Sequence, residues 1–298
     1  VACHFLFISK NSLPSGGFFY FWTFRITNTI IMNKVVLITG GSSGIGKSIG
    51  EFLHQRGFVV YGTSRNPERV LNSVFPLVAL DVRDADSIHA AVAKVIAASG
   101  RLDIVINNAG VGITGPLEEI PMEEMKNNFD TNFFGPIEVM KAVLPQMREQ
   151  KSGLIINVTS IAGYMGLPYR SIYSASKGAL ELITEALRME VKSFGIHITN
   201  VAPGDFATNI ASGRYHAPVI KGSAYEASYG ESLRTMDEHV DGGSNPNEMA
   251  EAVYKIIQTP NPNIHYKVGA FMQKLSIVLK RILPDKVYEK MLMNHYKL

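Results

Sequence analysis

Apolar and polar residues alternate along the chain between short β-branched runs and longer helical patterns. Seven runs have the length and composition of buried strands. They are VVLIT at 35–39, FVVYGT at 58–63, LVALD at 77–81, DIVIN at 103–107, LIINVT at 154–159, IHITNV at 196–201 and IHYKVG at 264–269. Helical patterns between them include 86–98, 122–148 and 173–193. The alternation predicts an α/β fold with a parallel sheet of about seven strands and right-handed helical crossovers.

One continuous domain over residues 32–298 is the simplest organisation, because no internal repeat or low-complexity linker divides the chain. Its longest stretch without a predicted strand, 205–245, is loop-like and carries three tyrosines among glycines and serines. We interpret it as a substrate lid, with an ordinary surface loop as the alternative. Asn245 and Pro246 then predict the N-cap and first turn of the next helix.

Residues 1–31 do not follow this pattern. They are rich in aromatics, but charged residues, proline and glycine interrupt every apolar run before it approaches the roughly 18 residues of a membrane helix. No signal-peptide pattern occurs. Met32 opens the segment MNKVVLITGG, which is typical of a protein start. We interpret the extension as a mis-assigned start or a disordered segment, with an interfacial membrane anchor as the alternative.

Composition and charge exclude several function classes. A net charge of +3 with mixed signs and no polybasic block gives no indication of nucleic-acid binding. Cys3 is the single cysteine, so an internal disulfide cannot form, which fits a reducing, cytoplasmic compartment. The sequence has no CxxC or HExxH motif and its eight histidines are scattered, so no metal is expected.

The first predicted strand runs directly into a glycine-rich loop, TGGSSGIGKSIGEFL at 39–53. Glycines allow a tight turn close to a pyrophosphate, and the N-terminus of the following helix attracts the anion. This order of strand, loop and helix predicts a dinucleotide-binding site. The expected cofactor contacts are Gly40, Ser42, Ser43, Gly44, Ile45 and Gly46.

The end of the second strand should select between the nicotinamide dinucleotides. An acid at this place accepts hydrogen bonds from the adenosine ribose of NAD. This chain has Ser64 and Arg65 instead, with no acid before Glu68. A guanidinium and a hydroxyl suit a 2′-phosphate, so we expect NADP(H) in preference to NAD(H). The alternative is that Arg65 points to solvent.

The segment YSASK places Tyr173 and Lys177 four positions apart, with small residues between them. In a helix these two side chains lie on one face, about one turn apart. The pair alone is also compatible with an ordinary exposed helix, so the motifs around it have to decide.

Several motifs, in this order, together resemble the short-chain dehydrogenase/reductase family. They are TGGSSGIG at 39–46, DV at 81–82, NNAG at 107–110, Asn132 within DTNFFG, Ser160 within NVTSIAG, YSASK at 173–177 and APGDFAT at 202–208. The resemblance covers nearly the whole chain from about residue 33. It implies a three-layer α/β/α Rossmann fold with a doubly wound sheet, and hydride transfer between a nicotinamide and a carbonyl or alcohol.

The resemblance implies a catalytic role for four residues. Tyr173 is the general acid that protonates the carbonyl, or the base in the reverse direction. Lys177 hydrogen-bonds the nicotinamide ribose and stabilises the phenolate, because a free phenol with a pKa of about 10 is a poor proton donor and acceptor near neutral pH. Ser160 holds the substrate oxygen, and Asn132 holds a water that feeds protons to the lysine.

The same resemblance extends the cofactor site to the adenosine and carboxamide ends. The small residues between Tyr173 and Lys177 are expected to let the cofactor lie close to their helix. The further contacts implied are Asp81, Val82, Asn108, Ala109, Gly110, Pro203, Gly204 and Thr208, in addition to Tyr173 and Lys177.

The tail, residues 270–298, is apolar and basic and continues well beyond the last predicted strand. It resembles the branch of hydroxysteroid and retinol dehydrogenases more than 3-oxoacyl-carrier-protein reductases, which end sooner. The expected function is therefore NADP(H)-dependent hydride transfer to a ketone or aldehyde, or from a secondary alcohol, with a steroid-, retinoid- or lipid-like substrate. The alternatives are an NADP(H)-binding regulatory protein without turnover and a 3-oxoacyl-carrier-protein reductase.

The expected partner is thus a small carbonyl or alcohol, and the sequence is compatible with a homo-oligomer. We expect the tail to form helices over the substrate cleft, with contact to an anionic membrane as the alternative.

Overall fold

Seven strands of the computed structural model form one parallel sheet, in the order β3-β2-β1-β4-β6-β7-β9. The structure describes residues 33–206, 213–241 and 244–298, so the extension 1–31 lies outside the described residues. All seven predicted strands are confirmed. Their bounds are β1 Val35–Ile38, β2 Val59–Ser64, β3 Leu77–Ala79, β4 Ile104–Asn107, β6 Gly153–Val158, β7 Ile196–Pro203 and β9 His265–Val268.

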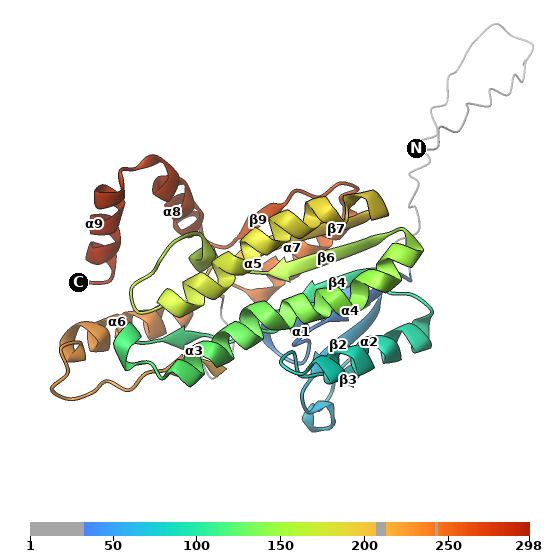
Figure 1. Ribbon diagram of the computed structural model, residues 1–298, viewed down its shortest axis with the longest axis horizontal. Coiled ribbons are helices and arrows are strands. Elements are labelled where there is room, and N and C mark those ends of the chain that lie inside the picture. The colour runs from blue at the N-terminus through green and yellow to red at the C-terminus, as the bar shows by residue number, and fades with distance from the viewer. Residues whose placement is uncertain (1–32, 207–212, 242–243) are drawn as a thin grey trace, which may run out of the picture. The chain divides into compact units, whose positions relative to one another are not determined.

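Helices cover both faces of this sheet, which gives three layers (Figure 1). Helices α2, α4 and α5 lie on one face, and α1 and α7 lie on the other. The described helices are α1 Gly44–His54, α2 Ala85–Ser99, α3 Met122–Phe129, α4 Gly135–Gln150, α5 Ser171–Glu190, α6 Glu226–Asp241, α7 Pro246–Gln258, α8 Phe271–Ile282 and α9 Asp285–His295. The predicted Rossmann fold is therefore confirmed.

Both faces of the central strands are apolar because helices bury them on both sides. Val105 of β4 packs in the core beneath α2, α4 and α5, whereas its neighbour Ile106 packs in the core beneath α1 and α7. Strand order reverses between β1 and β4, since the chain first builds outward through β2 and β3 and then returns. In such sheets the ligand crevice lies at the carboxyl ends of these two strands.

The helix predicted over 122–148 is interrupted. α3 ends at Phe129, and a π-helical turn, Asp130–Phe134, separates it from α4. The N–H of Gly135 bonds the carbonyl of Asp130, five residues back. Pro136 has no N–H with which to close the ordinary bond to Asn132, so the wider turn is accommodated there. This turn holds Asn132.

The sequence predicted a loop-like stretch over 205–245. The structure instead places a short strand and a helix within it. The strand β8 (Tyr215–His216) pairs with β5 (Ile113–Thr114), and α6 occupies much of the rest. Tyr229, Leu233 and Met236 lie at helical spacing and are buried or partly buried. That spacing was a signal for α6, but the glycines and serines before it obscured the pattern.

The segment after α6 agrees with the prediction, because Asn245 caps α7 by accepting a hydrogen bond from the N–H of Asn247 at 3.0 Å. The tail forms α8 and α9. Within the described ranges, no helix has both the length and the apolar character to cross a membrane.

Candidate active site

The glycine-rich loop between β1 and α1 adopts a conformation that only glycine tolerates well. Gly40 and Gly44 have φ angles of +65° and +53°. A Cβ on Gly46 would lie 2.4 Å from the carbonyl oxygen of Gly40, so a larger residue would displace the loop. The loop leads into the N-terminus of α1, whose first turn presents backbone N–H groups. This cradle fits the pyrophosphate of a dinucleotide.

Three polar side chains lock the loop onto β2 and β4. The hydroxyl of Thr39 accepts hydrogen bonds from the N–H groups of Asn108 and Ala109, both at 3.0 Å. The Asn108 amide donates to the carbonyls of Thr39 (3.0 Å) and Gly40 (3.2 Å). Thr63 accepts from the N–H of Gly40 at 3.2 Å. The sequence did not predict a role for Thr39 or Thr63, because a threonine at a strand end carries no distinctive pattern.

A cavity of about 730 Å³ opens at the carboxyl ends of β1 and β4. Most of the predicted cofactor residues line it: Gly40, Ser42, Ser43, Gly44, Ile45, Ser64, Arg65, Asp81, Val82, Asn108, Ala109, Gly110, Tyr173, Lys177 and Pro203. Gly46 packs beneath the loop and Gly204 lines a neighbouring cavity. Thr208 lies outside the described residues.

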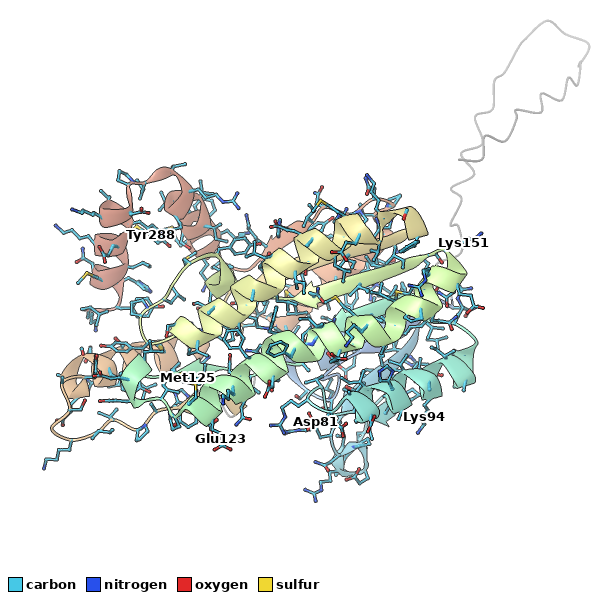
Figure 2. All side chains as sticks on the ribbon, viewed as in Figure 1. Asp81, Lys94, Glu123, Met125, Lys151 and Tyr288 are labelled. Atoms are coloured by element: carbon cyan, nitrogen blue, oxygen red, sulfur yellow. The ribbon has the colours of Figure 1, made fainter. Side chains whose placement is uncertain are left out.

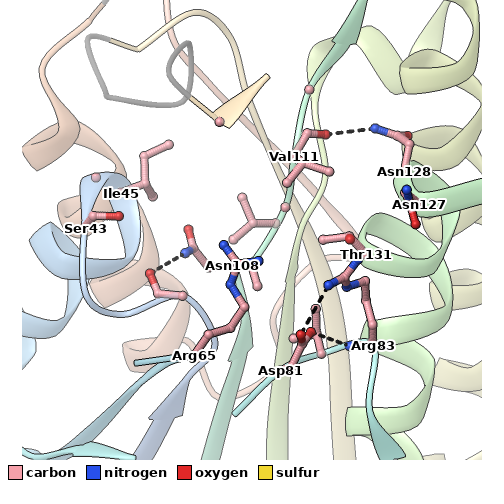
Figure 3. Close-up of a pocket in the computed structure, with 18 of the residues that line it drawn as sticks. Ser43, Ile45, Arg65, Asp81, Arg83, Asn108, Val111, Asn127, Asn128 and Thr131 are labelled. Atoms are coloured by element: carbon pink, nitrogen blue, oxygen red, sulfur yellow. Dashed lines mark hydrogen bonds and ion pairs between the residues drawn. The ribbon is translucent and has the colours of Figure 1, made fainter. Parts of the chain in front are cut away.

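Two arginines and an aspartate lie together at the end of this cavity where the adenosine is expected (Figure 3). Asp81 forms an ion pair with Arg83 at 3.4 Å. Partial burial acts to raise the pKa of Asp81, but hydrogen bonds and charge from Arg83, and the charge of Arg65, outweigh it and lower the pKa. Arg83 was missed, although it stands immediately after the DV motif. The cationic surroundings fit a phosphate at this end.

Lys177 is the deepest charged group of the site. Helix α5 presents it with Tyr173, four residues earlier, toward the same cavity. Its side chain is only 4% exposed, and Nζ donates a hydrogen bond to the Val158 carbonyl at 3.0 Å. Burial lowers the pKa of Lys177, partly opposed by Tyr173 and Glu181. The Tyr173 ring is partly buried, and the guanidinium carbon of Arg170 lies 5.2 Å from its centroid.

Asn132 is fully buried within the π-helical turn. Its Oδ1 accepts from the N–H of Val111 at 2.9 Å, and its Nδ2 donates to the Val111 carbonyl at 2.8 Å. A Cβ on Gly110 would lie 3.1 Å from Asn132 Oδ1 and 3.3 Å from Lys177 Nζ, so the two side chains flank the same glycine. The Ser176 hydroxyl lies 3.0 Å from Asn128 Oδ1, and Ser176 itself does not line the first cavity.

Ser160 stands where β6 ends and also caps the turn that follows. Its hydroxyl accepts a hydrogen bond from the N–H of Ala162 at 3.1 Å. Ser160 lines a second cavity of about 580 Å³, which shares Pro203 with the first. The second cavity is lined by Met165, Leu167, Arg170, Asp205, Arg214, Met236, Met272, Gln273, Leu279, Met291, Leu292, His295 and Tyr296, among others. Its apolar part comes mainly from α8, α9 and the segment after Ser160.

A buried carboxylate lies one helical turn beyond Lys177. The side chain of Glu181 is 7% exposed. It accepts hydrogen bonds from Tyr164 and Asn200, both at 3.0 Å, and from Thr159. His265 of β9 contacts Glu181 at 2.7 Å, and its other ring nitrogen contacts Glu185 at 3.0 Å.

Within this network, the negative charge of Glu181 acts to raise the pKa of Lys177 against the larger effect of burial. Burial, followed by the negative charge of Glu181, raises the pKa of Tyr164 far above that of a free phenol. The sequence did not predict this network, since its members come from separate elements of the fold. The spacing of Tyr173, Lys177, Glu181 and Glu185, every four residues along α5, was the available signal.

We expect Glu181→Gln to move the high-pH limb of the turnover profile to lower pH. Removing the carboxylate charge lowers the pKa of Lys177 further, so the lysine loses its proton at a lower pH. A glutamine amide would also face hydrogen-bond donors, which should cost about 1–3 kcal/mol of folding stability. Turnover against pH and thermal unfolding measure the two effects.

Glu185→Gln is the matched control, because that side chain is 44% exposed and contacts the same histidine. Its pH profile should stay close to that of the wild type. Equal shifts in both variants would contradict a specific role for Glu181.

Comparisons with known proteins agree with this geometry. The family profile described as short chain dehydrogenase matches residues 34–227. A 3-ketodihydrosphingosine reductase of Bacteroides thetaiotaomicron is 41% identical over 86% of this chain and 95% of its own length. An uncharacterised oxidoreductase of Bacillus subtilis is 34% identical over 87% of this chain and 97% of its own.

A solved structure is also similar. The short-chain dehydrogenase from Streptomyces avermitilis superposes with a TM-score of 0.75 at 32% identity, and the match covers 89% of this chain and 97% of that one. The fold, the glycine loop and the Tyr173 and Lys177 pair lead to the same conclusion as the profile. The chain belongs to the short-chain dehydrogenase/reductase family and is an oxidoreductase that uses a nicotinamide cofactor on a carbonyl or CH–OH group.

Proposed function

We propose that the protein is an NADP(H)-dependent reductase of a long-chain, lipid-like ketone, with 3-ketodihydrosphingosine as the first compound to test. The observation that carries this proposal is the second cavity, which begins at Ser160 and continues between methionine and leucine side chains. Flexible methionines adapt to an alkyl chain of variable shape. The name and 41% identity of the Bacteroides thetaiotaomicron relative support the same substrate class.

Each side chain of the site has a separate role in the reduction of the ketone. NADPH, when bound in the first cavity, supplies the hydride. Ser160 hydrogen-bonds the ketone oxygen at the junction of the cavities, and Tyr173 gives its phenolic proton to that oxygen as negative charge develops there. Lys177 stabilises the phenolate that remains. Asn132, which the Val111 backbone holds in place, is proposed to position the water through which protons reach Lys177.

The proposal is tested by NADPH oxidation with ketones of increasing alkyl length. We expect kcat/KM to rise roughly two- to fourfold for each methylene until the cavity is full, since each buried CH₂ contributes about 0.8 kcal/mol. Leu279→Trp should remove the advantage of long chains and spare short ketones, because Leu279 lines the cavity. Val287→Trp, at a position 52% exposed on α9, is the control.

Two results would argue against this substrate class. Faster turnover of a short acetoacetyl thioester than of any long-chain ketone would favour the 3-oxoacyl-carrier-protein reductase alternative. Tight NADPH binding without turnover of any ketone would favour the regulatory alternative.

The preference for NADP(H) is proposed from Arg65, which lines the adenosine end beside Arg83. We expect Arg65→Ala to raise KM for NADPH by about 10–100-fold and to leave KM for NADH nearly unchanged, because a charge-assisted hydrogen bond contributes about 1.5–3 kcal/mol. Initial rates with both cofactors measure this. Arg69→Ala is the control, since that side chain is 80% exposed and lies outside the cavity lining. Parallel losses for both cofactors would contradict the proposal.

A further inference from the structure

The outer face of α8 carries an exposed apolar stripe. Phe271, Val278 and Ile282 are 71%, 48% and 68% exposed, and the partly buried Leu275 completes a spacing of three or four residues. That spacing places all four on one side of the helix. A contiguous group of exposed, large apolar side chains usually indicates a surface that binds another molecule.

The opposite side of α8 belongs to the substrate cavity. Gln273, Ser276 and Leu279 line the cavity, and Gln273 donates to the Asp205 carboxylate at 2.6 Å. Met272 also lines it while remaining 67% exposed, so this methionine stands at a boundary between the cavity and the surface. One helix therefore separates the cavity from the stripe.

Contacts with the rest of the domain fix α8 and α9 in place. Ile277 of α8 and Tyr288 of α9 are buried in a small core with Ile161, Met165 and Ala202. The Tyr288 hydroxyl contacts the Met165 sulfur at 2.8 Å, and Figure 2 shows Tyr288 on α9. The stripe is thus presented by an anchored helix.

Basic residues accompany the stripe. Lys274 and Arg281 flank one side of it by helical position, and α8 contains no acidic residue. Lys280 lies farther round the helix, where it pairs with Asp285 at 3.5 Å. An apolar stripe with a cationic border complements the interface of an anionic bilayer, in which apolar side chains enter the acyl boundary and cations meet the headgroups. A second copy fits less well, because a two-fold contact would bring the same cations together.

We propose that the outer face of α8 docks on an anionic lipid bilayer, with the cavity beneath it receiving its substrate from that bilayer. Docking requires only the surface of α8. The delivery of substrate rests on the proposed function, since it requires a lipid-like ketone. The bilayer-facing group consists of Phe271, Leu275, Val278 and Ile282 with Lys274 and Arg281.

Vesicle co-sedimentation of the full chain tests docking without any turnover. We expect binding to vesicles that contain phosphatidylglycerol and much weaker binding to pure phosphatidylcholine. The double variant Phe271→Ser and Ile282→Ser should lower the partition coefficient by about tenfold or more, because it removes the side chains that enter the bilayer. Leu182→Ser with Met189→Ser is the matched control, since those α5 residues are 67% and 73% exposed.

Charge gives an independent second variant. Lys274→Gln with Arg281→Gln should lower binding to the anionic vesicles by about tenfold, as each cation near such a surface contributes roughly fivefold or less. Neither double variant alters a cavity-lining residue, so NADPH-dependent reduction of a short soluble ketone should persist and show that the fold is intact.

Docking is overturned if the wild type does not sediment with anionic vesicles, or if the α8 variants bind as well as the α5 control. It is also overturned if sedimentation velocity shows a dimer that the α8 variants abolish, because a second copy would then cover the stripe. Binding without turnover of long-chain ketones would refute the proposed substrate and leave docking intact. Turnover of long-chain ketones without binding to vesicles would refute docking and leave the proposed substrate intact.

Discussion

Replacing Tyr173 by phenylalanine should lower kcat for ketone reduction by about 10²–10⁴-fold, the range that general acid catalysis usually contributes. The variant loses a single hydroxyl from a ring that keeps its place beside Arg170. Without that hydroxyl the reduced carbonyl oxygen has no positioned proton donor. Stopped-flow and steady-state NADPH oxidation with a long-chain ketone measure the change.

Cofactor binding should survive this substitution. The substitution leaves the glycine loop, Arg65 and the Thr39 contacts unaltered, so the affinity for NADPH should remain nearly that of the wild type. Tyr61→Phe serves as a control, because that hydroxyl meets Ser99 at 2.9 Å outside the cavities. A Tyr173→Phe variant that retained more than about a tenth of wild-type kcat would assign the proton transfer to another group.

Replacing Lys177 by methionine should abolish most turnover and at the same time stabilise the fold. In the proposed mechanism the ammonium stabilises the Tyr173 phenolate, so its loss should lower kcat by about 10²-fold or more. Its burial is nevertheless unfavourable, since the net effect of the surroundings is to lower its pKa. An unbranched methionine fills a similar volume without a charge to desolvate. Activity at this position is therefore obtained at the expense of stability.

The stability gain should depend on pH in a definite direction. The pKa of Lys177 in the native state lies below the 10.5 of a free lysine, so between those two values the unfolded chain binds more protons than the native protein. Wild-type stability from this group thus rises with pH across that window. The excess stability of Lys177→Met should be full below the native pKa and shrink as pH approaches 10.5.

Thermal unfolding of both proteins over a pH series measures this difference. Each kcal/mol recovered should raise Tm by roughly 2–4 °C. The hydrogen bond that Lys177 donates to Val158 is also lost, at a cost of about 1–3 kcal/mol, which limits the gain. A variant less stable than wild type at neutral pH would mean that this bond and the attraction to Glu181 outweigh the desolvation of the charge.

Patterns within short segments were enough to predict most of the helices and strands. The strands are β-branched runs, and the glycine loop, Asn245 cap and Tyr173 and Lys177 pair are each defined within a few residues, so the sequence could predict them. Two local predictions failed for local reasons. The π-helical turn at Asn132 depends on Pro136, and the helical signal of α6 was masked by the small residues before it.

By itself, the sequence determined the α/β class, the number of strands and their places along the chain, the place of the nucleotide loop and the helical face that carries Tyr173 and Lys177. Only the tertiary structure decided that Arg83 lines the first cavity with Arg65 and Asp81 and that Glu181 contacts His265, 84 positions further along. It likewise decided that α8 divides the second cavity from an exposed apolar stripe. The physical reason is that periodicity and turn chemistry act between near neighbours, whereas burial, ion pairs and shared cavities depend on which elements the strand order places side by side.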